Sequence, residues 1–428
     1  MMKKSKITDG IVLGFAAFSM FFGAGNLIFP AGIGAAAGTQ WPVALLALTI
    51  ASIIVPLLAL MATTQKEGGY EAACEPIGKW YYNFTFAFLS IFVVTLANLP
   101  RTAATTYEMS VAPFFPQIPI WAVVIVYFAI ALFLALDTNQ LVDRIGKYMT
   151  PVLLVLMVII IVKGFITPIG ATQPTGQEGV FANAFIELYY TGDIYSGLMF
   201  SMLLAAAAMS KGYTNDKERR GVMGIACVIA GIAFFVIYGG LLVIGANANS
   251  VYGADMDRTT LLVSITQHLL GGVGAVALAL AVAIACMSTA VALISMGGNF
   301  FSGLTKNKVS YKTCVIVICV LGCVIGSMGV ENIISFAGPA FLTVFPAGIV
   351  LTVVALMGKW CPNQGAYKYS VLFALACGAV DGLAALGIPG VSMLTAWLPF
   401  AGVGFAWVVP AIVGFFVGWA KYKFVPAK

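Results

Sequence analysis

Long apolar runs alternate with short polar or Gly/Pro-containing segments along nearly the whole 428-residue chain. Because a helix needs about 20 mostly apolar residues to cross a bilayer, the runs predict about twelve transmembrane helices in a single all-α membrane domain, residues 1–428. The predicted spans are 8–36, 40–64, 79–112, 118–137, 145–166, 193–211, 219–246, 271–303, 312–328, 333–357, 368–387 and 394–420. The connections 65–78 and 256–270 are amphipathic, and such segments often lie at the interface or move as gates.

Lysine and arginine collect on alternate connections between these spans. All 22 of them except Arg101, Lys163 and Arg258 fall on one side when twelve spans are assigned. The positive-inside rule makes that side cytoplasmic, so both termini are expected in the cytoplasm of a multi-pass protein. One helix more or fewer would destroy the segregation.

Composition excludes a water-soluble fold, since 61% of the residues are hydrophobic and 9% are charged, against about 25% in soluble domains. The net charge of +6 reflects topology, so no nucleic-acid partner is expected, and no obligatory protein partner is implied. Eight scattered cysteines and a single histidine, His268, offer no metal-ligand cluster and no nucleophile with a base. We therefore expect neither an enzyme nor a cofactor, and the membrane lipid is the expected surroundings.

The first span contains Gly23, Ala24, Gly25 and Asn26 near its middle, with Pro30 one turn later. Membrane glycines commonly serve close helix packing. Two glycines and an asparagine within four residues instead predict an unwound stretch, which a membrane tolerates only where it lines a cavity or is buried in protein. The exposed amides at such a break suit a carboxylate, and the carbonyls suit an ammonium group or a sodium ion.

Inverted-repeat transporters carry a second broken helix in the corresponding span, here the sixth. That span offers Ser196, Gly197 and Ser201 after Gly192, which is a weaker match than the first span. In the eighth span Ser288 and Thr289 are adjacent hydroxyls that either bond back to their own helix or hold a sodium ion with carbonyls of a broken helix.

Arg101, Thr105 and Glu108 share one face of the third span because they are spaced i, i+4 and i+7. A charge inside a membrane is costly, which makes it a candidate functional group. One interpretation pairs Arg101 with Glu108 beside a substrate pathway. The other places both as a solvated pair past the outer end of the span.

Several motifs resemble the branched-chain amino acid:cation symporter family of the BrnQ type. They are FSMFFGAGNLIFP at 18–30, PRTAATTYE at 100–108, LVDRIGKYMTP at 141–151, CMSTAVALIS at 286–295 and GPAFLTVFPAGIVL at 338–351. The resemblance implies a bacterial cytoplasmic (inner) membrane carrier that imports leucine, isoleucine and valine with a cation, usually Na+. It also implies a leucine-transporter-like fold of five-plus-five inverted repeats, with the first repeat at about 8–166, the second at about 193–357, and two extra helices at about 368–420.

On this resemblance the backbone of residues 23–26 would hold the charged groups of the substrate. The cation would lie between carbonyls near Ser19 and Phe22 and the oxygens of Ala285, Ser288 and Thr289. Phe200 and its apolar neighbours could line the pocket for a branched side chain. The family tends to carry an acidic residue in a TMDAL-like run of the sixth span, where this chain reads Tyr195 to Leu198 and the acid is missing.

Three alternatives stay open. A proton-coupled carrier of another small neutral amino acid would use Glu108 as its titrating group, in which case H+ replaces Na+. A channel would normally show a ring of repeated filter residues, which this chain lacks. A membrane-embedded enzyme is the least supported of the three.

Overall fold

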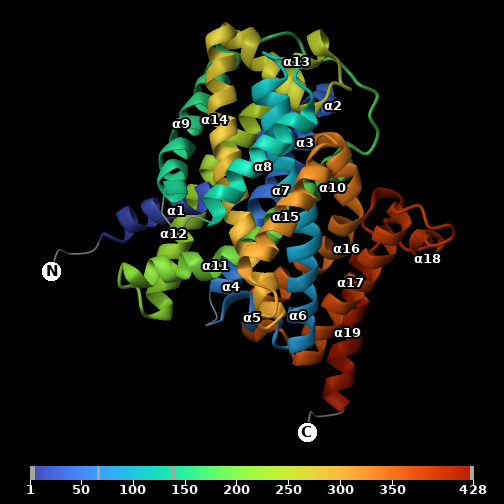
Figure 1. Ribbon diagram of the computed structural model, residues 1–428. Coiled ribbons are helices and arrows are strands. Elements are labelled where there is room, and N and C mark those ends of the chain that lie inside the picture. The colour runs from blue at the N-terminus through green and yellow to red at the C-terminus, as the bar shows by residue number, and fades with distance from the viewer. Residues whose placement is uncertain (1–4, 65–67, 137–140, 425–428) are drawn as a thin grey trace.

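The computed structural model describes residues 5–64, 68–136 and 141–424, and the regular structure of these residues is helical throughout (Figure 1). Seven helices in these ranges are long and apolar enough to cross a membrane, and four shorter ones are also apolar. The prediction of a polytopic, all-α membrane protein is thereby confirmed. Lys3, Lys4, Lys66 and Lys428, all part of the positive-inside argument, lie outside the described residues, so the orientation of the termini stays a prediction.

The first predicted span is two helices, α1 (Lys6–Phe21) and α2 (Ala24–Ala37), and the sixth is α10 (Val180–Glu187), η5 (Leu188–Thr191) and α11 (Asp193–Ser210). The other elements in chain order are η1 (Gly38–Gln40), α3 (Trp41–Leu48), η2 (Thr49–Ile54), α4 (Val55–Thr64), α5 (Gly69–Cys74), α6 (Lys79–Phe88), η3 (Leu89–Asn98), α7 (Leu99–Thr106), η4 (Tyr107–Val111), α8 (Ile120–Leu136), α9 (Leu141–Ile166), α12 (Asp216–Phe234), η6 (Phe235–Gly239), α13 (Gly240–Tyr252), α14 (Arg258–Leu304), α15 (Tyr311–Gly326), α16 (Val330–Met357), η7 (Gly358–Trp360), α17 (Gln364–Ala385), α18 (Met393–Ala396), η8 (Ala401–Val403) and α19 (Val408–Phe424).

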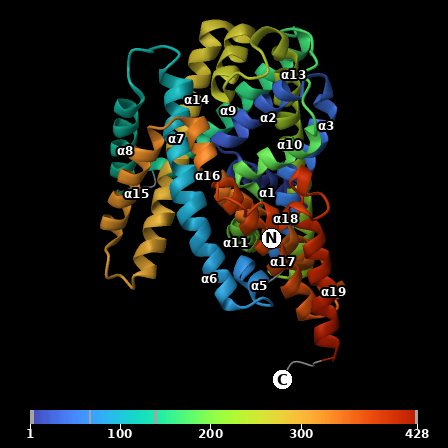
Figure 2. The same cartoon turned by 90° about the vertical axis from the view of Figure 1, so that its right-hand side faces the viewer.

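Two packed groups of helices share the interior. The two halves of the first span pack along α12 and α13, and α11 packs on α4 and α1. In Figure 2 the second group, α7, α8, α14 and α15, lies to one side of the first. This second group buries its own apolar cluster, which includes Leu99, Phe128 and Ile294. The last helices, α17 and α19, pack on each other, and α17 also packs on α16.

Four short π-helical segments, η2, η3, η4 and η6, interrupt three of the long helices, with η3 and η4 in the same one. A π-helical turn adds a residue to the turn and so changes the direction of the side chains around it, and it is frequent at functional sites. Here η2 carries Ser52, η3 carries Asn98 and η6 carries Tyr238. All three side chains belong to the site described below.

The sixth span is longer than predicted. The sequence interpretation began it at residue 193, whereas α10 and η5 precede that residue and run into it through Gly192. The polar stretch 171–179 before α10 and the polar run at 187–193 hid this first half from a search for one continuous apolar segment. In contrast, the predicted start of the eighth span is confirmed, because α14 bends sharply at Gly271, which separates 258–270 from the long apolar part.

Candidate functional site

Both broken helices are interrupted within one or two residues. Between α1 and α2, Phe22 and Gly23 are extended, and Asn26 N–H already bonds to the Gly23 carbonyl. The unwound part is therefore shorter than the predicted 23–26, and Ala24 to Asn26 form the first turn of α2. Between η5 and α11, Gly192 adopts a left-handed conformation with φ of 79°, which favours glycine because it has no Cβ.

Each break presents a helix N-terminus whose N-cap residue is a glycine and makes no side-chain cap, while at α11 the Asp193 N–H donates to Thr191 Oγ1 at 3.4 Å. The amides at the start of α2 and α11 carry a partial positive charge, and the end of α1 carries carbonyls. This arrangement can bind a carboxylate at one point and a cationic group at another, as the sequence predicted for the first break. The assignment of these groups to a substrate stays a prediction.

One side-chain cluster ties the two breaks together. Asn26 Nδ2 donates to Asp193 Oδ1 at 3.0 Å, and Tyr238 Oη and the Phe21 carbonyl lie at 2.6 Å and 3.0 Å from the same nitrogen. Since an amide group has two hydrogens, Asn26 serves two of these three acceptors at a time. Asp193 is the first residue of α11, so the bond links the start of α2 directly to the start of α11.

Arg101 lies between the two breaks and is buried. Its Nη1 donates to the carbonyl of Tyr190 at 2.8 Å, just before the second break, and its Nη2 donates to Asn98 Oδ1 at 2.9 Å. A Cβ at Gly25 would lie 2.8 Å from Nη2, so this glycine is needed for the close approach of the guanidinium. Close packing thus explains Gly25, whereas a Cβ at Gly23 would meet nothing nearer than 4.0 Å.

A cavity of about 270 Å³ ends at the second break. Its polar end is formed by Asn98, Gly192 and Ser196, and its far end by Tyr70 and Glu71 of α5. Its walls are apolar, and its other lining residues are Tyr82, Phe86, Leu89, Val93, Val94, Tyr195, Met199, Phe200, Met202, Leu203, Leu293 and Met296. The cavity lies between α11 on one side and η3 and α14 on the other. Its size and apolar walls suit a small solute with an aliphatic side chain.

Among the residues predicted on the sixth span, Ser196 and Phe200 line this cavity, while Gly197 and Ser201 do not. Successive residues of a helix turn by about 100°, so Gly197 and Ser201 share another face. A Cβ at Gly197 would lie 2.3 Å from the Pro56 carbonyl of α4, which makes this glycine a packing residue. The Ser201 hydroxyl donates to the Leu198 carbonyl of its own helix. Neither residue faces the cavity in this conformation, and their contact with substrate stays a prediction.

The predicted cation residues are not assembled in this conformation. The hydroxyls of Ser288 and Thr289 both donate to the Ala285 carbonyl, at 2.9 Å and 3.0 Å. Ser19 is exposed, and Phe22 stacks on Phe18. Helix α1 packs chiefly on α12 and α11, whereas α14 packs on α9, α7 and α15. A sodium site with these ligands therefore needs α1 to move toward α14, and the site stays a prediction.

Arg101 and Glu108 do not pair, so that part of the prediction is wrong. Glu108 Oε2 accepts from Thr259 Oγ1 at 2.6 Å, and Oε1 accepts from Val330 N–H at 2.8 Å. Thr105, between them, is buried, and within the described residues its hydroxyl has no hydrogen-bond partner. The third span is slightly unwound into η4 at Glu108, which carries that side chain away from Arg101.

Glu108 belongs to a charged cluster at the far end of the molecule from α5. Arg258 donates to Glu187 of α10 from Nε at 2.8 Å and from Nη2 at 2.6 Å, and its Nη1 pairs with Glu331 of α16. Its guanidinium also lies over the Phe29 ring of α2, 5.2 Å from the centroid. The Arg258 side chain thus joins α14 to α2, α10 and α16. These contacts close this end of the space between the two packed groups of helices.

The sixth span carries an acidic residue, Asp193, although the stretch Tyr195 to Leu198 compared with the family pattern lacks one. Asp193 ends the run Thr191–Gly192–Asp193. It lies two residues before Tyr195, where the stretch compared with the family pattern begins. Asp193 is 3% exposed and lies at the break itself. An acid that follows a glycine within a polar run, directly before an apolar helix, is the sequence signal that could have identified it.

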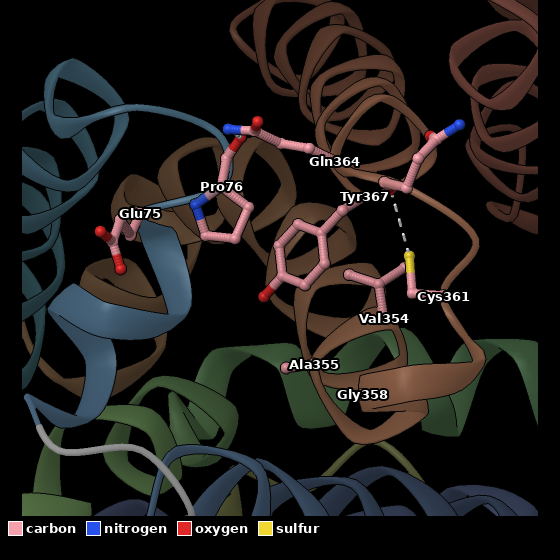
Figure 3. Close-up of a pocket in the computed structure, with 9 residues that line it drawn as sticks. Glu75, Pro76, Val354, Ala355, Gly358, Cys361, Gln364 and Tyr367 are labelled. Carbon is pink, nitrogen blue, oxygen red and sulfur yellow. Dashed lines mark hydrogen bonds between the residues drawn. The ribbon is translucent and has the colours of Figure 1, made fainter. Parts of the chain in front are cut away.

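A larger cavity of about 420 Å³ lies away from the breaks, between Glu75 and Pro76 and the start of α17 (Figure 3). Gln364 Nε2 donates to the Pro76 carbonyl at 2.9 Å, and Tyr367 Oη donates to the Ala73 carbonyl at 2.7 Å. Of its lining residues in the described chain, Glu75 alone is charged. Without a cationic side chain or a helix break, this cavity is a poor match for an amino acid zwitterion.

Comparison with known proteins agrees with this architecture. A family described as "Branched-chain amino acid transport protein" matches residues 6–425. The branched-chain amino acid transport system 2 carrier protein of Pseudomonas aeruginosa is 32% identical over 95% of this chain and 94% of its own, and the branched-chain amino acid permease BraB of Bacillus subtilis is 29% identical over 99% and 97%. The solved structure titled "Inward facing conformation of Mhp1" matches with a TM-score of 0.65 and 16% identity, over 97% of this chain and 90% of that chain.

Proposed function

Because the chain belongs to the branched-chain amino acid transport protein family, we propose that it imports leucine, isoleucine and valine by symport with a cation, with Na+ as the coupling ion. The observation that carries the proposal is an apolar cavity whose polar end is formed by the second break, which the Asn26–Asp193 hydrogen bond joins to the first break. A branched-chain amino acid has the same division into a charged head and an aliphatic tail.

The charged head would lie at the breaks and the tail in the cavity. The amides at the start of α2 and α11 and the nearby Arg101 favour a carboxylate. Val93 and Phe200 offer apolar contact to the tail. Burial of aliphatic surface contributes about 25 cal/mol per Å² of apolar area, so the cavity walls would supply much of the affinity.

Transport requires that the site open to each side in turn. The cavity extends from Gly192 toward α5, while the Arg258 cluster joins α2, α10 and α16 at the other end. With the α5 end cytoplasmic, as the positive-inside rule predicts, this conformation opens inward. The protein would then lie in the bacterial cytoplasmic membrane with both termini inside.

Coupling to Na+ would use Ser19, Phe22, Ala285, Ser288 and Thr289 once α1 moves against α14. In the outward-open state the carbonyls at the end of α1 would complete the oxygen set that the two hydroxyls begin. Release of Na+ to the cytoplasm would accompany the separation of α1 from α14. The Ser288 and Thr289 hydroxyls would then return to the Ala285 carbonyl, where they lie here.

A proton-coupled carrier of another small neutral amino acid is the alternative. Glu108 is a weak candidate for its titrating group, because this carboxylate already accepts two hydrogen bonds in the Arg258 region and lies apart from Asn26 and Asp193. The titrating group of such a carrier would instead be Asp193, which lies at the break where the substrate head group would bind.

Uptake into liposomes tests the proposal. Purified protein is reconstituted, and entry of radiolabelled leucine is followed with an inward Na+ gradient, with choline in place of Na+, and with a proton gradient. We expect uptake that requires Na+, that unlabelled isoleucine and valine inhibit, and that a Ser288→Ala, Thr289→Ala double variant loses. Uptake driven by protons alone would contradict Na+ coupling, and absence of leucine uptake under every gradient would contradict the substrate assignment.

A further inference from the structure

Asp193 has a carboxylate oxygen that nothing in the described chain satisfies. The residue is 3% exposed, and its Oδ1 accepts a hydrogen bond from Asn26, but its Oδ2 is buried without a hydrogen-bond partner. An ionised carboxylate removed from water is costly unless it is paired. A buried, half-satisfied carboxylate at the meeting point of two broken helices therefore indicates a missing positive charge.

A second orphaned oxygen lies beside it. The Ser52 hydroxyl is buried on the π-helical segment η2, and it also lacks a geometrically acceptable hydrogen bond within the described residues. Segment η2 packs on η5, directly before Asp193, and the Ser52 hydroxyl lies within interaction range of the Asp193 carboxylate without meeting hydrogen-bond geometry. Most serines in membrane helices bond to a carbonyl in the preceding turn. Ser52 does not, so its hydroxyl is available to a ligand.

The charged and titratable groups that face Asp193 do not neutralise it directly. They are Arg101 from α7 and Tyr238 from η6. Arg101 directs Nη1 and Nη2 to the Tyr190 carbonyl and to Asn98, and no carboxylate of the described residues lies within ion-pair distance of it. Tyr238 is engaged by Asn26. The remaining neighbours, Asn26 and Thr191, carry no charge.

We propose that Asp193 Oδ2 and Ser52 Oγ form a binding site for one small monovalent cation, a sodium ion or a proton, inside the group formed by the first, second, sixth and seventh spans. A carboxylate and a hydroxyl are hard oxygen ligands that suit Na+, and a single negative charge matches a monovalent ion better than a divalent one. A proton on Oδ2 would serve the same end by donating to the Ser52 hydroxyl. Both occupants cancel the buried charge.

The inference rests on the proposed function and deepens it. This site is distinct from the Ser288 and Thr289 site, since its ligands lie on α11 and η2 and contact the α2 terminus through Asn26. A cation there stabilises the arrangement that joins both breaks, and those breaks are where substrate would bind. Occupancy by the cation would then raise substrate affinity, and by linkage substrate would raise the affinity for the cation.

The test uses the full-length protein with three variants. Asp193→Asn keeps an oxygen for Asn26 and removes the charge, Ser52→Ala removes the hydroxyl, and Ser370→Ala is the control. Ser370 is equally buried, but its hydroxyl donates to the Tyr367 carbonyl of its own helix, so its removal affects no cation. Two quantities are measured: the thermal unfolding midpoint without substrate in NaCl or choline chloride over a range of pH, and leucine counterflow in liposomes.

In the sodium arm, wild type and Ser370→Ala are stabilised by NaCl relative to choline, and the half-saturating Na+ concentration rises about tenfold or more in Ser52→Ala and Asp193→Asn. In the proton arm, the pH dependence of the midpoint that wild type shows is lost in Asp193→Asn and shifted in Ser52→Ala, which removes the acceptor for the proton on Oδ2. Counterflow at saturating leucine persists in Ser370→Ala, whose hydroxyl lies outside both the breaks and the cavity. Should Asp193→Asn fail to fold, Ser52→Ala decides the matter.

The proposal is overturned if Asp193→Asn or Ser52→Ala retains both the Na+ dependence and the pH dependence of wild type. Failure of the proposed function has a different signature, because wild type would then show no leucine uptake or counterflow. The substrate-free unfolding measurement still tests the cation site in that case. The two failures are therefore distinguishable.

Discussion

The Arg258 guanidinium donates two hydrogen bonds to one oxygen of Glu187, at 2.8 Å from Nε and 2.6 Å from Nη2. The two residues belong to different helices, α14 and α10, and neither side chain is more than a quarter exposed. Because Arg258 also pairs with Glu331 and lies over Phe29, its contacts span the segments that would separate in an outward-open state. The Glu187–Arg258 contact thus holds this end of the molecule closed.

Arg258→Ala is expected to shift the protein toward the conformation that is open at this end. Loss of a charge-assisted contact worth roughly 1.4 kcal/mol changes the population about tenfold. A cysteine placed at Ala36, which lines the adjoining cavity, should then react about tenfold faster with an impermeant maleimide added outside. Arg220→Ala, at an exposed position of α12, is the control. An unchanged reaction rate in Arg258→Ala would exclude the gating role.

Arg101→Ala is expected to lower leucine uptake by at least about tenfold, because the Tyr190 carbonyl and Asn98 would lose buried donors worth roughly 1–3 kcal/mol each. Arg101→Lys should recover only part of the activity, since one ammonium group cannot reproduce the planar pair of donors. Initial uptake rates at equal membrane expression decide the matter. Wild-type rates in Arg101→Ala would show that the residue has no part in transport.

Gly192→Ala is expected to reduce stability by about 1 kcal/mol, because alanine is strained at a φ of 79°. Gly224→Ala is the matched control, since this helical glycine has open space around its Cβ position and should be neutral or slightly stabilising. Thermal unfolding can be followed with a thiol-reactive dye, as most of the cysteines are buried. Equal midpoints for the two variants would mean that Gly192 is not a conformational requirement.

Val93→Phe is expected to change selectivity. Val93 Cγ1 lies 3.8 Å from the position of a Cβ at Gly192, so a larger side chain there would fill the cavity next to the second break. Leucine should lose apparent affinity more than alanine, because the longer aliphatic tail needs the lost space. Competition of each amino acid against labelled leucine in the variant and in wild type measures the ratio. A uniform loss for both would point to general destabilisation by overpacking instead.

The sequence predicted the helical architecture well, because apolar runs of membrane length and the break at Gly23 are local features. It failed where a feature depends on tertiary contacts. Packing on α4 fixes the helical phase that turns Gly197 and Ser201 away from the cavity in this conformation, and their predicted contact with substrate stays a prediction. The pairing of Arg101 with Glu108 was inferred from spacing alone, and the π-helical turn η4 changes that spacing.

The buried position of Asp193 at the second break also depends on tertiary contacts, and the sequence alone does not reveal it. In sequence it marks the start of an apolar run, and its polar neighbours resemble the end of a loop. Only the fold shows that α10 and η5 lie before it, which turns a span boundary into a buried break. Its hydrogen-bond partner Asn26 and its neighbours Ser52 and Tyr238 are 167, 141 and 45 positions away along the chain, too far for a local sequence pattern to indicate a contact.

A cryo-electron microscopy structure of the protein with leucine and NaCl tests the central claim most directly, namely that substrate binds where the two broken helices meet. The account predicts density for the amino acid between Gly23 and Gly192, with its side chain toward Val93 and Phe200. Density in the cavity beside Tyr367 instead, with none at the breaks, would contradict it.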